Sequence, residues 1–154
     1  RLLVYRWPEV TAALERLSVA KASNRFDGAT VEYAGPHAGH VLRTVACWMQ
    51  MLRPGEHTRA HRHTHSTVCH VHRGHGYSVI DGQRFDWGPG DCFVVPSWSW
   101  HEHVNDSPGE QAYLFSMNDA PIMEVFAVER EEELGGLTGQ QEVSAVFDPL
   151  SAAR

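Results

Sequence analysis

Histidines are the residues of this chain whose number and spacing point most directly to chemistry. The sequence contains 11 of them, and seven lie between His57 and His75. His61 and His63 are two residues apart, and side chains at positions i and i+2 of a β-strand point to the same face of the sheet. Two imidazoles placed in this way can share one metal ion without strain in the backbone. The pair alone is a weak signal, because most histidines lie at the surface or in the core.

The sequence around this pair and around His101 strengthens the indication. In the segment PGEHTRAH, Gly55 and five further residues precede His61. A second segment also begins with a glycine followed by five residues, and it runs from Gly90 through His101 to Asn105. The residues between the two segments contain a β-hairpin pattern, which returns a later strand beside the first. In a barrel built in this way, His61, His63 and His101 are expected to enter one cavity.

Short strands must position these residues. Apolar and β-branched stretches alternate with Gly- and Pro-containing turns about every 8 to 12 residues, which is typical of an antiparallel sandwich or barrel. The expected elements are a short N-terminal helix with Pro8 in its first turn, a strand pair or one bent strand over Val41–Leu52, a hairpin of Tyr77–Ile80 and Gln83–Trp87, and strands at Cys92–Val95 and Ala112–Ser116.

The ends of the chain differ in pattern from the middle. Residues 1–28 are assigned to the N-terminal helix and a linker, residues 29–133 to the barrel, and residues 134–154 to a C-terminal arm. The charge run Glu129–Glu133 is interpreted as the solvated end of a helix. The arm is polar and contains glycines, so we expect it to be loose or laid on a neighbouring surface.

The composition excludes several classes of protein. Hydrophobic residues make up 42% and charged residues 21% of the 154 positions, which excludes a disordered chain, a coiled coil and a collagen. The formal net charge of −6 argues against nucleic acid as a partner. No apolar run approaches the roughly 18 residues of a membrane span. Three widely spaced cysteines fit a cytoplasmic protein, and a chain that begins with Arg1 is expected to be part of a longer protein.

The histidine segments resemble the paired motifs of the cupins, and more closely those of the gentisate 1,2-dioxygenase group of ring-cleaving cupins. The resemblance rests on RPGEHTRAHRHT (Arg53–Thr64), GYSVIDGQRFDWGPGD (Gly76–Asp91), VVPSWSWHEHVN (Val94–Asn105) and LFSMNDAP (Leu114–Pro121). It covers roughly residues 2–133, and PSWSWHEH is its most specific part. Enzymes of this group look like two cupin halves in one chain, and this sequence resembles the C-terminal half.

The resemblance implies an all-β fold: an antiparallel jelly-roll β-barrel with a short N-terminal helix and a C-terminal helical or arm segment. It implies a metal site of His61, His63 and His101 that holds Fe(II), although zinc, nickel or another divalent ion also suits three imidazoles. The general cupin motif adds a glutamate ligand. This sequence lacks that glutamate, and the gentisate group lacks it too. The implied reaction opens the ring of a hydroxylated aromatic acid with O2, and the substrates of close relatives are gentisate, salicylate and 1-hydroxy-2-naphthoate. The implied partners are an N-terminal cupin half and further copies in a homo-oligomer.

Two further positions bear on this reaction. Strand parity places Cys69 on the face of His61 and His63, where the catalytic halves of the group tend to carry a basic residue that faces the substrate carboxylate. A thiol cannot make the bidentate contact of an arginine, so we expect this chain alone to open gentisate weakly or not at all. His103 shares the face of His101 and is the candidate catalytic residue, which would hydrogen-bond a substrate oxygen or shuttle a proton. The alternative for His103 is a packing role.

The other polar candidates receive structural interpretations. Glu102 is expected to point away from the cavity, and two tryptophans to pack at the barrel mouth or a subunit contact. His70 and His72 are expected to face outward, and His57 and His75 to lie at turns. His65 follows the pair by two residues, but nothing downstream pairs with it as a ligand. The tryptophans are Trp98 and Trp100. The competing hypothesis for the whole chain is a non-catalytic structural cupin half, which supports oligomerisation and still binds a metal.

Overall fold

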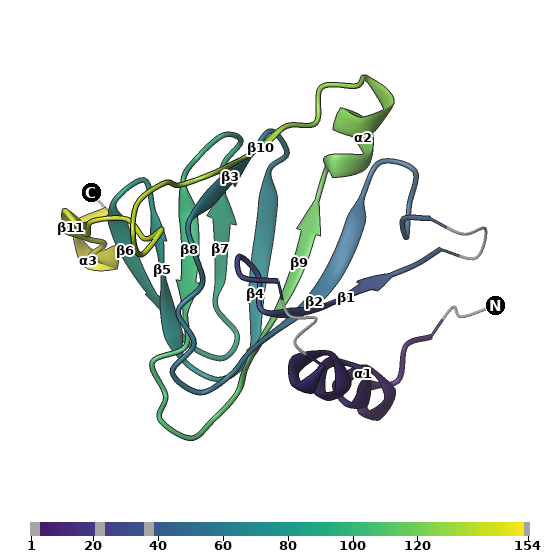
Figure 1. Cartoon of the computed structure of the whole chain (residues 1–154), viewed down its shortest axis with the longest axis horizontal. Helices are drawn as coiled ribbons and strands as arrows, with labels where there is room; N and C mark the ends of the chain where they lie inside the picture. The colour runs from purple at the N-terminus through teal and green to yellow at the C-terminus, as the bar shows by residue number, and fades with distance from the viewer. Residues whose placement is uncertain (1–3, 21–23, 36–38, 153–154) are drawn as a thin grey trace.

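The computed structural model describes residues 4–20, 24–35 and 39–152, and its strands form two sheets that face each other (Figure 1). The first sheet has the strand order β1-β2-β9-β4-β7, and the second has the order β10-β3-β8-β5-β6-β11. All of these neighbours pair in antiparallel fashion except β11 and β6, which are parallel. The expected all-β architecture of two packed sheets with a short N-terminal helix is confirmed.

The elements have the following bounds. The first sheet contains β1 (Ala29–Tyr33), β2 (Ala46–Leu52), β4 (Thr67–Arg73), β7 (Cys92–Val95) and β9 (Ala112–Asn118). The second contains β3 (His61–His63), β5 (Gly76–Ile80), β6 (Gln83–Trp87), β8 (His101–Val104), β10 (Glu131–Glu133) and β11 (Ala145–Val146). The helices are α1 (Trp7–Val19), α2 (Ala120–Val125) and α3 (Pro149–Ala152). Residues 1–3 and 21–23 of the predicted segment 1–28, and residues 153–154 of the predicted arm, lie outside the described residues, and the three-part division stays a prediction.

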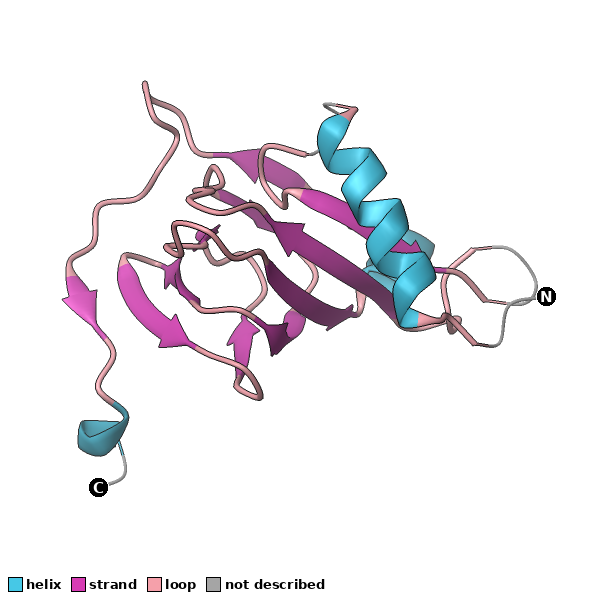
Figure 2. Cartoon of the chain, turned by 90° about the horizontal axis from the view of Figure 1, so that it is seen from below, coloured by secondary structure: helices cyan, strands magenta, loops and turns pink. Residues whose placement is uncertain are grey.

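Helix α1 covers the outer face of the first sheet, as Figure 2 shows. Pro8 is placed in its first turn, where a missing N–H costs no hydrogen bond. Val10 and Leu14 are buried on one side of the helix, where they join Met49 and Met51 of β2 and the neighbouring Tyr113 in a hydrophobic cluster. This cluster fixes the orientation of β2, because successive strand residues point to opposite faces.

Strand β2 therefore presents its other face to the space between the sheets. Ala46, Trp48 and Gln50 line a cavity there. The predicted strand over Val41–Leu52 was too long at its N-terminal end, since β2 begins at Ala46. Residues 41–45 instead form bends closed by a hydrogen bond from Leu42 N–H to the Val45 carbonyl (3.1 Å).

The interpretation of Glu129–Glu133 as a helix end is wrong, because Glu131–Glu133 forms strand β10 along the edge of β3. An unpaired strand edge offers a row of backbone donors and acceptors, and β10 satisfies that row beside His61–His63. Glu132 lies opposite Arg62 and forms an ion pair with it (2.6 Å) on the outer face. Glu131 lies opposite His63 and so shares the cavity face.

The C-terminal arm lies on the second sheet. The Ala60 N–H donates to the Gly139 carbonyl (2.6 Å), and β11 then pairs with β6. The Gln141 backbone N–H donates to Glu102 Oε2 (2.9 Å), and the Gln141 side chain donates to the Val79 carbonyl (2.9 Å). Of the two predicted behaviours of the arm, the one laid on a surface is confirmed. No described helix is long and apolar enough to cross a membrane.

Candidate metal centre

A cavity of about 320 Å³ opens between the two sheets. Strand faces supply its walls: the first sheet contributes residues from β1, β2, β4, β7 and β9, and the second contributes residues from β3, β8 and β10. Five histidines belong to the lining besides His40 at the mouth, namely His61, His63, His65, His101 and His103. The cavity is thus the place where most of the chemically capable side chains of the chain meet.

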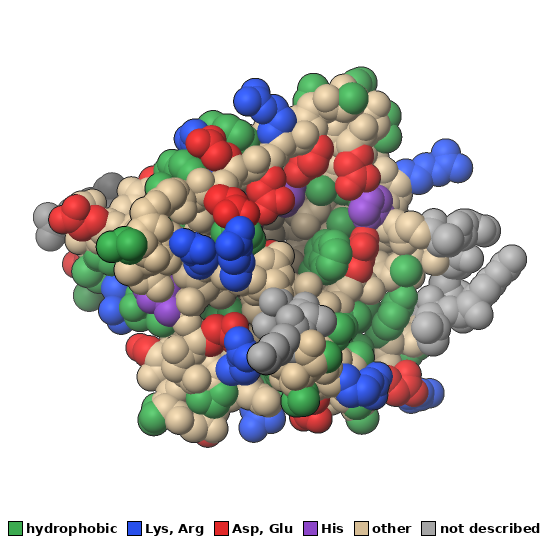
Figure 3. Space-filling model, viewed as in Figure 1, with side chains coloured by type: hydrophobic (Ala, Val, Ile, Leu, Met, Phe, Trp, Pro, Cys, Tyr) green, Lys and Arg blue, Asp and Glu red, His purple; other side chains and the backbone are tan. Residues whose placement is uncertain are grey.

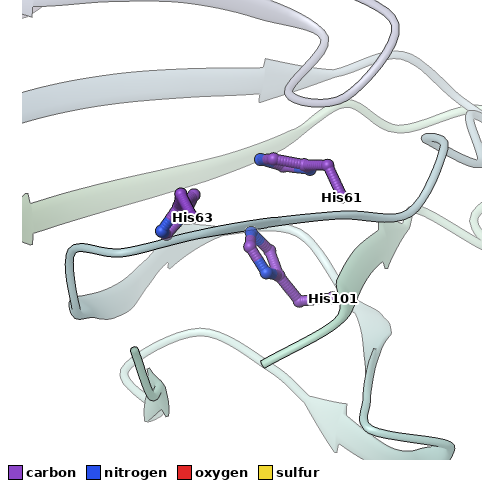
Figure 4. A group of neighbouring side chains, drawn as sticks. All are labelled: His61, His63 and His101. Atoms are coloured by element: carbon purple, nitrogen blue, oxygen red, sulfur yellow. The ribbon is translucent and has the colours of Figure 1, made fainter. Parts of the chain in front are cut away.

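His61, His63 and His101 converge in this cavity, as Figure 4 shows. His61 and His63 leave β3 on the same face, and His61 is directly opposite His101 in the pairing of β3 with β8. Each histidine offers one ring nitrogen, and these three atoms lie within 4.8 Å of one another. All three side chains are buried, with exposed fractions of 3%, 7% and 3%. The three histidines therefore lie together, as the alternation of residues along the strands leads us to expect from the sequence.

The surroundings of the three rings suit a metal ion. His63 Nδ1–H donates to the His65 carbonyl (2.8 Å) and His101 Nδ1–H donates to the Ser99 carbonyl (2.9 Å), which leaves the Nε2 lone pair of each ring free. His61 Nδ1 is buried and has no hydrogen-bond partner. Burial lowers the pKa of His61 to about 3 and the pKa of His63 to about 4, and it lowers the pKa of His101 well below its usual value. Neutral imidazoles are the form that binds metals, so the residues present fit a divalent ion.

His103 lies deeper in the same cavity. Its Nδ1 is hydrogen-bonded to the Ser78 hydroxyl (2.8 Å), and that oxygen also accepts a hydrogen bond from Trp87 Nε1 (3.0 Å). Burial lowers the pKa of His103 to about 3, so the ring is neutral at pH 7. The Ser78 contact fixes the ring orientation and leaves Nε2 as the nitrogen available to a ligand. This geometry is compatible with the predicted catalytic role, which stays a prediction.

Comparisons with known proteins agree with this geometry. A family model described as "Cupin domain" matches residues 48–117. The 5-aminosalicylate 1,2-dioxygenase of Comamonas sp is 42% identical over 146 residues. The 1-hydroxy-2-naphthoate 1,2-dioxygenase of Nocardioides sp. (strain KP7) is 35% identical over 129 residues. The crystal structure of a salicylate 1,2-dioxygenase from Pseudoaminobacter salicylatoxidans with gentisate adducts superposes with a TM-score of 0.75 at 32% identity. This chain contains a cupin domain and is similar over most of its length to the gentisate-type dioxygenases.

The cupin matches only part of each of these proteins. The alignments cover 94%, 83% and 86% of this chain but only 38%, 33% and 37% of the respective relatives. The chain therefore spans a little over a third of the length of the dioxygenases it resembles. We therefore treat the activity, the substrate and the partners of this cupin as proposals.

Cys69 of the cupin lines the cavity as expected, but it does so from β4 of the first sheet and not from the strand that carries His61 and His63. The thiol is buried, and burial together with the nearby charge of Asp27 raises the pKa of Cys69 to about 12. The thiol is therefore protonated and a poor nucleophile at neutral pH. Asp27 itself was missed in the sequence, because its place beside β4 depends on the turn that precedes β1. Burial and then the charge of Glu131 raise the pKa of Asp27 to about 7.

Gln50 was missed in the sequence, and so was the partner of His65. Gln50 is 5% exposed, and its Nε2 has no hydrogen-bond partner, so this amide N–H is available to a ligand oxygen. Its position on the cavity face of β2 was a usable signal. His65 stacks on His63 with ring centroids 3.5 Å apart, and its Nδ1 contacts Glu129 Oε1 (2.7 Å). That partner was not predictable while residues 129–133 were interpreted as helix.

The remaining candidates lie outside the cavity. His70, His72 and His75 do not line it, and Glu102 points away from it as expected. His57 is not simply an exposed turn residue, since its Nε2 contacts Glu102 Oε1 (3.0 Å). Trp98 and Trp100 belong to the turn before β8, and the guanidinium of Arg62 lies over both rings at 4.5 and 4.4 Å. These two tryptophans therefore pack against β3 from outside the cavity.

The lowered histidine pKa values predict that acid destabilises the metal-free cupin. A buried imidazole whose folded-state pKa is depressed contributes stability that is complete above the unfolded value of about 6.5 and is lost as the pH falls toward the folded value. For His61, His63 and His103 the loss begins near pH 6.5 and continues toward pH 4 to 3. Each group contributes on the order of 1 kcal/mol per pH unit. Urea unfolding of the metal-free chain at pH 7 and pH 5 measures this loss, and equal midpoints at both pH values would contradict it.

Proposed function

We propose that this cupin is a ring-cleaving dioxygenase module, in which His61, His63 and His101 hold Fe(II) and an aromatic hydroxy acid is opened with O2. The convergence of three buried, neutral histidines in one cavity between the sheets carries the proposal. The relatives support it, since the three reported above are named as 1,2-dioxygenases of aminosalicylate, hydroxynaphthoate and salicylate. Zinc or nickel also suits three imidazoles, so metal content must be controlled in any assay.

When bound by His61, His63 and His101, the metal would supply a +2 charge that attracts a chelating acid and the capacity to activate dioxygen. The chain's own residues supply the rest. Gln50 directs an unpartnered amide N–H toward a substrate oxygen. His103, whose ring is oriented by Ser78, offers Nε2 for a hydrogen bond to a substrate oxygen. Val95 and Trp48 contribute apolar surface beside the ring, which helps to exclude water.

The test of this proposal is turnover by the chain loaded anaerobically with Fe(II) and then exposed to air. Gentisate, salicylate, 1-hydroxy-2-naphthoate and 5-aminosalicylate are the substrates to compare. We expect O2 uptake matched by a ring-opened acid in the mass spectrum for at least one of them. A chain that binds Fe(II) and shows neither with any of the four would contradict the proposal.

A second candidate function is a non-catalytic cupin half, and one observation favours it. Among the described residues that line the cavity there is no lysine or arginine. Cys69 occupies the position where the related catalytic halves are expected to carry a cation. Loss of one charge-assisted contact costs about 1.5 to 3 kcal/mol, or roughly ten- to a hundred-fold in rate. Such a half would bind the metal and support an assembly without turning over substrate.

Replacement of Cys69 separates the two candidates. We expect Cys69→Arg to tighten gentisate binding by about ten-fold, because a guanidinium can reach the carboxylate, while metal affinity changes much less. Cys92→Arg is the control, since Cys92 is exposed and does not line the cavity. Isothermal titration of gentisate into the zinc-loaded variants gives the comparison. Robust gentisate turnover by the unmodified chain would show that no cation is needed at residue 69.

The proposal includes the cellular compartment of the protein and its assembly. The three cysteines, Cys47, Cys69 and Cys92, are free, which is compatible with a reducing cytoplasm. The lengths of the relatives favour a second cupin half as the partner, N-terminal to this one, and assembly into a homo-oligomer. Light scattering of the chain at micromolar concentration tests the assembly, and a strictly monomeric species would contradict it.

A further inference from the structure

The three ligand histidines border an open cavity, so packing does not hold their rings on every side. Figure 3 shows the hollow in this face of the molecule, with histidine visible at its edge. Hydrogen bonds to the rings and to the backbone must therefore set where each imidazole nitrogen points. For His63 and His101 these bonds include contacts with one turn, residues 96–100, which leads into β8.

Consecutive residues of this turn bond to two different ligand residues. The Trp98 backbone N–H donates to the His63 carbonyl (2.8 Å). The Ser99 carbonyl accepts a hydrogen bond from His101 Nδ1–H (2.9 Å). Within the described residues, His61 opposite His101 is the only pair in register between β3 and β8. Beyond that pair, the turn therefore joins the two strands at the end where His63 lies.

Trp98 adopts a backbone conformation that is uncommon for a tryptophan. Its φ is 61°, in the left-handed region where glycine is the usual residue. A residue with a Cβ atom is unfavourable there, and a bulky residue persists only when its surroundings hold it. Strained residues cluster at functional sites, and here the strain falls on the residue whose N–H reaches a metal ligand.

The indole ring of Trp98 supplies the restraint. The Arg62 guanidinium lies over the ring at 4.5 Å from its centroid, and the Arg130 guanidinium lies over it at 5.4 Å. Arg62 belongs to β3 and is held in turn by an ion pair with Glu132 (2.6 Å). Arg130 belongs to the segment that leads into β10. The ring is thus anchored to both strands, and these cation–π contacts offset the cost of the left-handed backbone.

We propose that Trp98 is a positioning residue for the metal centre, whose ring anchors the turn that orients His63 and His101. This inference rests on the proposed function, since it takes these histidines as metal ligands. Trp98 does not line the cavity and touches neither metal nor substrate. It acts through its own N–H and through the adjacent Ser99 carbonyl.

The metal-free chain gives the first test. Long-range ¹H–¹⁵N spectra at pH 7 distinguish the protonated from the unprotonated nitrogen of a neutral imidazole. In the parent chain we expect His101 to carry its proton on Nδ1, since the Ser99 carbonyl accepts it. In Trp98→Ala we expect a mixture of the two tautomers at His101, because the turn is no longer anchored. A single Nδ1–H tautomer in both chains would contradict the positioning role.

Cobalt(II) titration gives the second test, because the visible spectrum of bound cobalt reports the coordination geometry and needs no turnover. We expect Trp98→Ala to bind cobalt about ten-fold more weakly, as is typical when a partner of a metal ligand is lost, and to show a changed spectrum. Trp98→Phe keeps an aromatic face for the two guanidinia, so its affinity should stay within about three-fold of the parent.

Trp98→Gly separates positioning from stability. It removes the ring, but it also removes the cost of the left-handed backbone. We therefore expect its urea midpoint to lie closer to the parent than that of Trp98→Ala, while its cobalt affinity still falls about ten-fold. A merely structural role would make affinity and midpoint change together.

Trp100→Ala is the matched control. Trp100 also lies under the Arg62 guanidinium (4.4 Å), but its φ is not left-handed, and its N–H bonds to Asp81 (2.9 Å) and not to a ligand. We expect Trp100→Ala to leave the cobalt affinity within about two-fold of the parent. Equal losses in Trp98→Ala and Trp100→Ala, or parent-like cobalt affinity in Trp98→Gly, would overturn the inference.

The outcomes also separate this inference from the proposed function. Failure of the parent chain to bind cobalt would overturn the metal centre, whereas the tautomer in the metal-free chain would still decide whether Trp98 orients His101. Weakened cobalt binding in Trp98→Ala, found together with no turnover of any aromatic acid by the Fe(II)-loaded parent, would support the positioning role and overturn only the dioxygenase proposal.

Discussion

His101→Ala is expected to weaken metal binding at least about 100-fold. The variant removes one of three imidazole nitrogens that converge within 4.8 Å, and it removes the one supplied by β8. Loss of a group that merely orients a ligand typically costs ten- to a hundred-fold in affinity, so loss of the ligand itself costs more. Competition of the chain with a chromophoric chelator for Zn(II) at pH 7 measures the change, and Fe(II) content after anaerobic loading should fall in parallel.

The control for this experiment must be a histidine outside the cavity. His75 is exposed and does not line the cavity, so His75→Ala should leave the metal affinity within about two-fold of the parent. This control matters because several surface histidines can bind zinc adventitiously. Equal affinity of His101→Ala and the parent, or an equal loss in His75→Ala, would show that the metal binds elsewhere.

Glu102→Ala is expected to lower the free energy of unfolding by about 3 kcal/mol. Glu102 is 0% exposed, and its carboxylate accepts hydrogen bonds from His57 Nε2 (3.0 Å) and from the Gln141 backbone N–H (2.9 Å). The variant leaves the half-buried Gln141 N–H without an acceptor, which costs about 1 to 3 kcal/mol, and it removes most of a fully buried side chain, whereas the exposed His57 can bond to water. Urea denaturation should show a fall of about 1 to 2 M in the midpoint.

The Glu102→Ala substitution should also weaken metal binding. Glu102 lies between His101 and His103 on β8, and it joins that strand to the C-terminal arm through Gln141. We therefore expect a measurable loss of metal affinity in addition to the loss of stability. Glu132→Ala is the control, because the exposed pair of Glu132 with Arg62 contributes at most about 1 kcal/mol. A midpoint for Glu102→Ala that matches that control would contradict the buttressing role of Glu102.

Local patterns in the sequence were sufficient to predict that His61, His63 and His101 lie together. His61 and His63 obey strand parity, and the turn-rich stretch before His101 marks the start of the strand that pairs with them. The same alternation placed Glu102 outside the cavity, and these predictions succeeded because each depends on one short strand whose faces cannot exchange once one is buried. Cys69 also lines the cavity, but from β4 of the opposite sheet, so the alternation of one strand does not explain its position.

The features that the sequence did not reveal all depend on distant pairing. Glu131 reaches the cavity only because β10 adds to the edge of β3, and a run of acids carries no signal for that edge. Asp27 reaches Cys69 through a turn whose neighbours are far away in sequence. A structural role was expected for Glu102, but its partner Gln141, 39 residues later, was not predictable. Charge patterns along a chain do not show which charges will face one another.

Isotope transfer from oxygen in a single turnover tests the central claim most directly. The chain is loaded with Fe(II) without air, mixed with an aromatic hydroxy acid and exposed to ¹⁸O₂, and the acid product is analysed by mass spectrometry. A dioxygenase centre at His61, His63 and His101 predicts a ring-opened product with both atoms of labelled oxygen, and no such product from His101→Ala. An unlabelled product, or labelled product formed equally by His101→Ala, would contradict the assignment of this chemistry to the three histidines.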